Sequence, residues 1–261
     1  MNTTIGCTTR PFGDAGYTDI FRRIADAGFS DVAIFNNIGI DSQSDPAHTA
    51  AVRLAAEAAS LKCSMLLAHA ELETEAPEER YRRVIDHAAA LGASWLLDLG
   101  TGELELLDRY VELMRTMAPY AESVGVKISA KPHGGITLTS DDLIALQARV
   151  NHRSFGICYD PGNIIYYTAG EERPETNIDR IAPIVTTAIV KDCVIDNEKP
   201  EVMINPGDGL VDFHKVFSGL ARGGFRGPLY LECVAPGEPS EIDRNVANAR
   251  AMIEQIVSDV T

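Results

Sequence analysis

The chain has 261 residues and a formal net charge of −15 at pH 7. So large an excess of carboxylates disfavours binding to phosphate backbones and to anionic membranes, and we expect neither nucleic acid nor a membrane as a partner. Because no Pro-, Gly- or Ser-rich linker and no internal repeat divides it, the chain is predicted to form one domain over residues 1–261.

Short apolar runs predict eight strands, at residues 4–8, 31–35, 64–69, 94–99, 127–131, 155–160, 186–191 and 229–233. They are brief and apolar on both faces, which is typical of parallel strands covered by helices. Amphipathic segments between them predict helices at 17–27, 77–91, 103–124, 139–150, 212–220 and 241–257. Eight repeated strand–helix units with right-handed crossovers fit a single-domain (β/α)8 TIM barrel of the α/β class.

The five cysteines are widely spaced and include no Cys-x-x-Cys pair, which indicates a reducing compartment. The first residues show neither a basic segment nor a long apolar stretch, so we expect no secretory signal and a cytoplasmic location.

Several catalytic motifs are absent from the sequence. There is no Gly-x-Ser-x-Gly, no Gly-Lys-Ser/Thr phosphate loop and no His-Glu-x-x-His, and no Gly-x-Gly-x-x-Gly follows the first strand. The phrase Pro206-Gly-Asp-Gly209 predicts a turn before a helix rather than a phosphate cradle.

Charged or hydrogen-bonding side chains follow four predicted strands, in Lys131-Pro-His-Gly-Gly, Tyr159-Asp-Pro-Gly-Asn163, Val190-Lys-Asp192 and Leu231-Glu-Cys233. Since the strand ends of a parallel barrel converge on one mouth, we predict an active site there that contains Lys131, His133, Asp160, Lys191 and Glu232.

Three more residues are candidate substrate ligands: Arg10 after the first strand, His69 at the end of the third, and Asn163. The first two are equally compatible with a role at the rim, and Asn163 is also compatible with a turn.

The phrases at 159–163 and 190–192, followed by Gly224-Phe-x-Gly-x-Leu and Leu231-Glu232, resemble the xylose-isomerase-like TIM barrels. This superfamily contains sugar isomerases and epimerases, inosose dehydratases, hydroxypyruvate isomerases and class II apurinic endonucleases. The resemblance covers most of the chain and is strongest from Gly125 to Cys233. It is specific for the superfamily and much less so for the reaction.

The resemblance implies a divalent metal ion, Mn²⁺, Mg²⁺ or Zn²⁺, with Asp160 and Glu232 at two of four usual ligand positions. The other two positions differ, because Lys131-Pro-His133 replaces a common Glu-Asn-His and Ile189 replaces a histidine. Asp160, Glu232 and His133 with water remain a possible ligand set. Alternatively, Lys131 replaces the ion and polarises a substrate carbonyl.

The function that we expect is isomerisation, epimerisation or dehydration of a small sugar or keto-sugar through an enediolate. The metal, or the ammonium of Lys131 or Lys191, would hold the oxyanion, and Glu232 or His133 would be the general base. One alternative is a lyase or decarboxylase acting on an oxidised sugar acid. Another is a non-catalytic, sugar-binding pseudoenzyme or complex subunit. Barrels of this superfamily often dimerise, so a homo-oligomer is also possible.

Overall fold

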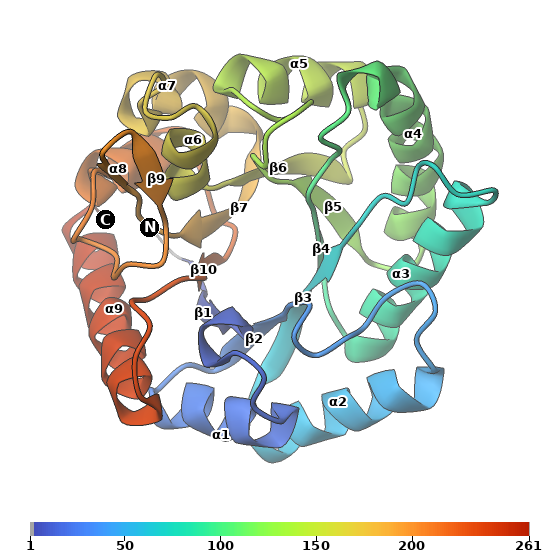
Figure 1. The fold of residues 1–261 in the computed structure, drawn as a ribbon. Coiled ribbons are helices and arrows are strands. Elements are labelled where there is room, and N and C mark those ends of the chain that lie inside the picture. The colour runs from blue at the N-terminus through green and yellow to red at the C-terminus, as the bar shows by residue number, and fades with distance from the viewer. Residues whose placement is uncertain (1–2, 261) are drawn as a thin grey trace.

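Eight parallel strands close into a barrel in the computed structural model, which describes residues 3–260 (Figure 1). The strands are β1 (Ile5–Thr8), β2 (Asp31–Ile34), β3 (Lys62–Ala68), β4 (Trp95–Asp98), β5 (Lys127–Ala130), β6 (Phe155–Tyr159), β7 (Val185–Val190) and β10 (Leu229–Leu231). Neighbouring strands pair in the order β1-β10-β7-β6-β5-β4-β3-β2, and β2 pairs with β1. All eight predicted strands and the TIM barrel fold are thereby confirmed.

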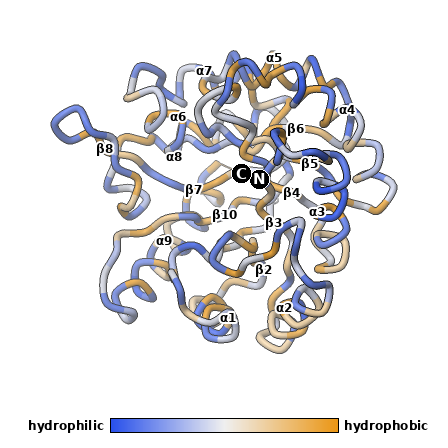
Figure 2. The backbone as a smooth tube through the Cα atoms, turned by 45° about the vertical axis from the view of Figure 1, so that its right-hand side comes forward, coloured by the Kyte–Doolittle hydropathy of each residue, from blue (hydrophilic) through white to orange (hydrophobic). Residues whose placement is uncertain are grey.

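Helices form a ring outside the barrel (Figure 1). They are α1 (Tyr17–Asp26), α2 (Pro46–Ala58), α3 (Pro77–Leu91), α4 (Leu107–Ser123), α5 (Ser140–Val150), α6 (Pro161–Tyr167), α7 (Pro174–Ile181), α8 (Phe213–Arg222) and α9 (Pro239–Asp259), with short 3-10 turns at Arg10–Phe12, Leu104–Leu106 and Ala182–Ile184. A small antiparallel hairpin, β8 (Val194–Asp196) with β9 (Lys199–Glu201), follows β7 and protrudes from the barrel (Figure 2).

Three helices, α2, α6 and α7, and the hairpin were not predicted. Asp45 caps the start of helix α2, because its side chain accepts a hydrogen bond from Ala47 N. The helix was missed because its alanine-rich sequence shows little contrast in hydrophobicity between its two faces. Helix α6 begins with Pro161 and Gly162, which indicated a loop, although proline is favoured in a first helical turn. Gly162 is required by close packing, because a Cβ there would lie 2.6 Å from the carbonyl oxygen of Lys191.

Two apolar cores hold the fold together. The larger core lies between the strands and the surrounding helices, and a smaller one fills the inside of the barrel. The inner core contains Ala33, Phe35, Met65, Leu67, Leu97, Cys158, Ile189 and Tyr230. Because the barrel interior is packed with side chains, polar chemistry is confined to the mouth above this layer.

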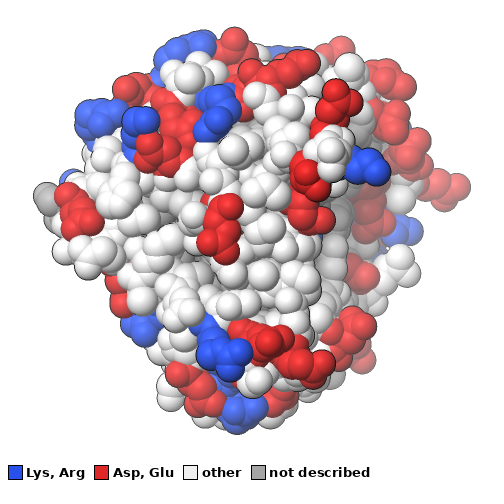
Figure 3. Space-filling view, turned by 60° about the vertical axis from the view of Figure 1, so that its left-hand side comes forward, with Lys and Arg blue, Asp and Glu red and all other residues white. Residues whose placement is uncertain are grey.

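Basic and acidic side chains are both distributed over the surface. On the face shown in Figure 3, Lys and Arg side chains form separate groups among acidic ones, and no continuous basic surface crosses it. Among residues 3–260, no helix is both long and apolar enough to cross a bilayer.

Candidate active site

The alternation of side chains along each strand builds the site. Cys158, Ile189 and Tyr230 point into the barrel core from β6, β7 and β10. Because side chains two residues apart lie on the same face of a strand, Asp160, Lys191 and Glu232 project inward just above that core. Lys131 follows β5 in the same way, two residues after Ser129, which hydrogen-bonds Thr187 across the barrel.

Two lysines and two carboxylates form a buried, closed ring of ion pairs. Lys191 Nζ lies 2.7 Å from Glu232 Oε1 and 3.1 Å from Asp160 Oδ2. Lys131 Nζ lies 3.0 Å from the same Asp160 oxygen and donates to Glu232 Oε2. All four side chains are at most 2% exposed. We call these four residues the charge ring.

Arg10 adds a third cation from the turn after β1. Its Nη1 atom lies 2.6 Å from Glu232 Oε1, and its side chain is 41% exposed to the open mouth. Three cations therefore face two carboxylates, which leaves an excess of one positive charge. An anionic group in the mouth would offset this excess.

The charges around Glu232 and Lys191 keep both side chains ionised. Burial alone would raise the pKa of Glu232, but Lys131, Lys191 and Arg10 together outweigh it and hold the pKa well below its ordinary value. Burial would likewise lower the pKa of Lys191, yet Asp160 and Glu232 raise it above its usual range. The lysine therefore stays an ammonium, and Glu232 stays a carboxylate whose oxygens are paired with three cations.

The two oxygens of Asp160 have separate roles. Oδ1 accepts from the backbone N–H of Asn163 at 2.9 Å and caps the start of α6. Oδ2 faces the two ammonium groups of the charge ring, although neither contact has good hydrogen-bond geometry. Asp160 thus caps a helix with one oxygen and belongs to the charge ring with the other.

His133 lies on the wall of the mouth, two residues beyond Lys131. Partial desolvation and then the charges of Lys131 and Lys191 lower the pKa of His133 to about 4, so its imidazole is neutral at pH 7. Its ring centroid lies 5.0 Å from that of Tyr167. A neutral imidazole beside two ammonium groups has a lone pair available to accept a proton.

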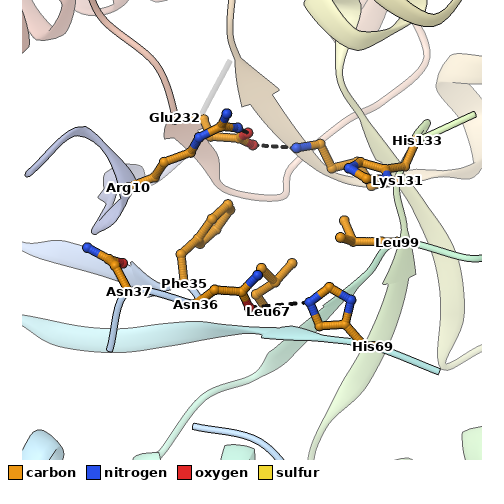
Figure 4. A pocket seen from close by; sticks show the side chains of 10 residues that line it. All are labelled: Arg10, Phe35, Asn36, Asn37, Leu67, His69, Leu99, Lys131, His133 and Glu232. Carbon is orange, nitrogen blue, oxygen red and sulfur yellow. Dashed lines mark hydrogen bonds and ion pairs between the residues drawn. The ribbon is translucent and has the colours of Figure 1, made fainter. Parts of the chain in front are cut away.

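A cavity of about 420 Å³ opens above the charge ring (Figure 4). It is lined by Arg10, Phe35, Asn36, Asn37, Leu67, His69, Leu99, Lys131, His133 and Glu232. Figure 4 shows Arg10, Glu232 and Lys131 together on one side, with His69 and Asn36 joined by a hydrogen bond on another. The cavity thus has positively charged side chains at its floor, apolar side chains in its walls, and two histidines.

Most of the predicted residues come together here. Arg10, His69, Lys131, His133 and Glu232 line the cavity, and Asp160 and Lys191 complete the charge ring beneath it. Asn163 does not line it, because its Nδ2 atom donates at 2.7 Å to the carbonyl oxygen of Pro132 and the side chain is buried. Its role is to fix the segment that carries Lys131 and His133.

Sequence reasoning missed Phe35, Asn36 and Asn37, which line the cavity after β2. The signal was present, because these residues end a predicted strand just as the other candidates do. Asn37 Nδ2 also donates to the carbonyl oxygens of Thr9 and Gly13, which steadies the turn around Arg10.

Asp192 is a structural neighbour rather than a partner of Lys191. Its carboxylate accepts from the backbone N–H groups of Cys193, Gly207, Gly209 and Val211. It therefore closes the long segment after β7 and holds the predicted turn at 206–209. Within that segment, Met203 Sδ lies 3.9 Å from Arg10 Nη2 at the edge of the mouth.

The side chains at the mouth do not form a ligand group for a divalent metal ion among the described residues. Within residues 3–260, no three His, Cys, Asp or Glu side chains come together as a ligand group, so Asp160, Glu232 and His133 are not assembled as one. The physical reason is that Lys131 and Lys191 already bind both carboxylates, and an ion placed between them would meet two ammonium charges. These residues do not fit a metal while both lysines are protonated.

The family model for the xylose isomerase-like TIM barrel matches residues 21–256. The chain belongs to this family. A xylose isomerase domain protein from Planctomyces limnophilus superimposes with a TM-score of 0.78 at 18% identity, covering 99% of this chain and 98% of that one. A D-allulose 3-epimerase from Methylomonas sp. gives 0.77 at 19% identity, covering 98% of each chain.

A third member of this fold, a xylose isomerase-like TIM barrel protein from Mycobacterium smegmatis in complex with magnesium, gives a TM-score of 0.78 at 17% identity and covers 100% of both chains. No curated protein sequence matches the chain significantly. At such identities these likenesses establish the fold, and the reaction has to be argued from the site.

Proposed function

We propose that this xylose isomerase-like barrel catalyses isomerisation, epimerisation or dehydration of a small sugar or keto-sugar through an enediolate. The observation that carries the proposal is the pair of ammonium groups fixed by Asp160 and Glu232 at the base of a cavity lined by two histidines. The epimerases among its structural neighbours support the substrate class.

The chemistry follows from these residues. His133 accepts a proton from the carbon next to the substrate carbonyl, the C–H electron pair forms a carbon–carbon double bond, and the carbonyl oxygen becomes an oxyanion. The ammonium groups of Lys131 and Lys191 stabilise that oxyanion in a site where water does not screen them. Return of the proton from His133 to the former carbonyl carbon, with transfer of the neighbouring hydroxyl proton to the oxyanion, forms the new carbonyl and completes an isomerisation. In a dehydration the oxyanion re-forms the carbonyl, the β-carbon–oxygen bond breaks, and the hydroxyl takes the proton from His133 and leaves as water.

Glu232 acts as an anchor in this scheme. Three cations hold its pKa low, so it remains a carboxylate and keeps both ammonium groups directed at the reacting oxygen. Arg10 and His69 are left to bind substrate hydroxyls or a carboxylate from the cavity wall. Magnesium in one neighbour shows that the fold accommodates an ion, whereas here the lysines supply the positive charge.

A lyase or decarboxylase acting on an oxidised sugar acid is the second candidate. The excess positive charge of Arg10, Lys131 and Lys191 over the two carboxylates favours it, because a substrate carboxylate would neutralise that excess. Loss of carbon dioxide from a 3-oxo acid yields the same oxyanion, held by the same ammonium groups.

Proton exchange tests the proposal directly. Keto-pentoses, keto-hexoses and 3-oxo sugar acids are incubated with the protein in D₂O and followed by NMR for deuterium at the carbon beside the carbonyl, for new sugars and for carbon dioxide. We expect exchange that is lost in Lys191→Met and His133→Gln. Binding of a sugar with no exchange across the panel would indicate a non-catalytic sugar-binding protein instead.

A further inference from the structure

We propose that the substrate has two parts, with the reacting sugar above the charge ring and a second, neutral hydroxylated unit in an adjoining cavity. The preferred class is therefore a glycoside or disaccharide that carries a free carbonyl. This inference rests on the proposed function, because it names the substrate class of the same site.

The adjoining cavity has a volume of about 300 Å³ and lies between the loops that follow β2 and β3. It is lined by Asn36, Ile40, Asp41, Ser42, Gln43, Leu67, Ala68, His69, Glu71 and Val84. Three of these, Asn36, Leu67 and His69, also line the cavity above the charge ring. The two cavities thus share part of their lining. The shared residues, which Figure 4 shows together on one side of the cavity above the charge ring, would contact the link between the two units.

The lining suits a sugar ring, which presents C–H groups on its faces and hydroxyl groups around its edge. Ile40, Leu67 and Val84 supply an apolar side. The lining also offers polar groups without a hydrogen-bond partner among the described residues, namely the Gln43 side-chain amide and Asn36 Nδ2. A few convergent polar groups against an apolar wall are typical of small-molecule sites.

The charges of the two cavities are opposite in sign. Above the charge ring the lining is cationic, whereas the adjoining cavity carries the carboxylates of Asp41 and Glu71. Glu71 is held by Arg80 and by Ser42, each at 2.6 Å, while only Oδ1 of Asp41 accepts hydrogen bonds, from Gln43 N and Ser44 Oγ. Carboxylates accept hydroxyl donors and repel anions, so the second unit is neutral.

Two keto sugars with the same reacting end test this inference: D-fructose, and isomaltulose, in which glucose is linked to fructose. Their dissociation constants are measured by titration calorimetry with the wild-type protein and with Gln43→Trp, which places an indole in the adjoining cavity from an exposed loop. Gln255→Trp, on the exposed side of α9, is the matched control.

We expect isomaltulose to bind at least tenfold more tightly than D-fructose, and Gln43→Trp to abolish that ratio while Gln255→Trp preserves it. Equal affinities in the wild type, a ratio that survives Gln43→Trp, or no binding of either sugar would overturn the inference. Deuterium exchange in the same samples separates the two proposals. Exchange without a disaccharide preference leaves the function standing, whereas the preference without exchange leaves only the adjoining binding site.

Discussion

The ammonium of Lys191 lies 2.7 Å from Glu232 Oε1 and 3.1 Å from Asp160 Oδ2, so one side chain joins two carboxylates that follow different strands. Lys131 makes the same two connections from β5. Each buried charge is therefore compensated by at least two opposite ones, and the cationic site in the barrel mouth is built on two buried lysines. The first four predictions below concern the charge ring and His133, and the fifth concerns Asn163, which holds the segment next to Lys131.

Replacing Lys191 with methionine should destabilise the protein. The change keeps the volume but leaves two buried carboxylates with one ammonium, and breaking a buried ion pair by removing one partner costs about 3–5 kcal/mol. Urea unfolding should show a loss of this size. The control is Lys215→Met, whose exposed ion pair with Asp212 at 2.8 Å is expected to contribute less than about 1 kcal/mol. Equal, small losses in both variants would show that the charge ring is not compensated as described.

Stability should depend on pH through Glu232. Its folded-state pKa lies below the ordinary value of 4.5, so its ionised form contributes stability above that value and loses it as pH falls through the folded pKa. Lys191 has a raised pKa, so its contribution is complete below its ordinary 10.5 and is lost as pH rises beyond that. The difference in unfolding free energy between wild type and Glu232→Gln should be constant from about pH 5 to 10 and shrink below about pH 4. A difference that grows on acidification would contradict the lowered pKa.

Metal binding should appear only when the lysines are removed. In a Lys131→Met, Lys191→Met double variant, Asp160 and Glu232 become free to bind a cation, so titration calorimetry should detect Mn²⁺ binding that the wild type lacks. Elemental analysis after dialysis against mixed divalent ions provides the second measurement. About one metal ion per wild-type chain, lost in Asp160→Ala, would show that the ion displaces the ammonium groups.

The pH dependence of the reaction should identify His133 as the base. Because its pKa is lowered to about 4, kcat/KM should fall only as pH drops toward 4, rather than near the ordinary 6.5. His133→Gln should remove activity by about 10²–10⁴-fold without changing the unfolding free energy appreciably. His69→Gln is the comparison, since His69 lines the same cavity away from the ammonium groups. Activity that survives His133→Gln and is lost in His69→Gln would transfer the role to His69.

Asn163 should act through the backbone and not through substrate contact. Asn163→Ala removes the bond to the Pro132 carbonyl and leaves a buried acceptor without its partner, at a cost of about 1–3 kcal/mol. Because Pro132 lies between Lys131 and His133, kcat should fall more than KM rises. A large rise in KM at constant kcat and unchanged stability would instead support the predicted role as a substrate ligand.

The sequence was sufficient to predict the barrel and the gathering of the candidate residues at the carboxyl ends of its strands, because short apolar runs and strand ends are local features. The charge ring itself was not predictable in detail. Its contacts join residues between 29 positions apart (Lys131 and Asp160) and 101 positions apart (Lys131 and Glu232), and only the closed barrel shows that each lysine meets both carboxylates. The contact of Asn163 was not predictable for a similar reason, since its partner is the carbonyl of Pro132 on another loop.

At the start of helix α6, the same residue, Asp160, ends a strand and caps a helix. The following Pro161-Gly162 indicated a turn. The glycine is present because α6 starts against the backbone of Lys191, a contact that no local pattern reveals.

The mutual compensation within the charge ring also constrains how this protein can diverge. A substitution that removes one lysine takes one of its cations from each buried carboxylate, and one that removes a carboxylate leaves each lysine with a single anionic partner. Intermediate sequences with three members are therefore disfavoured, and the four positions should change together. Homologues should accordingly divide into those that keep all four residues and those that replace several at once, with few sequences in between.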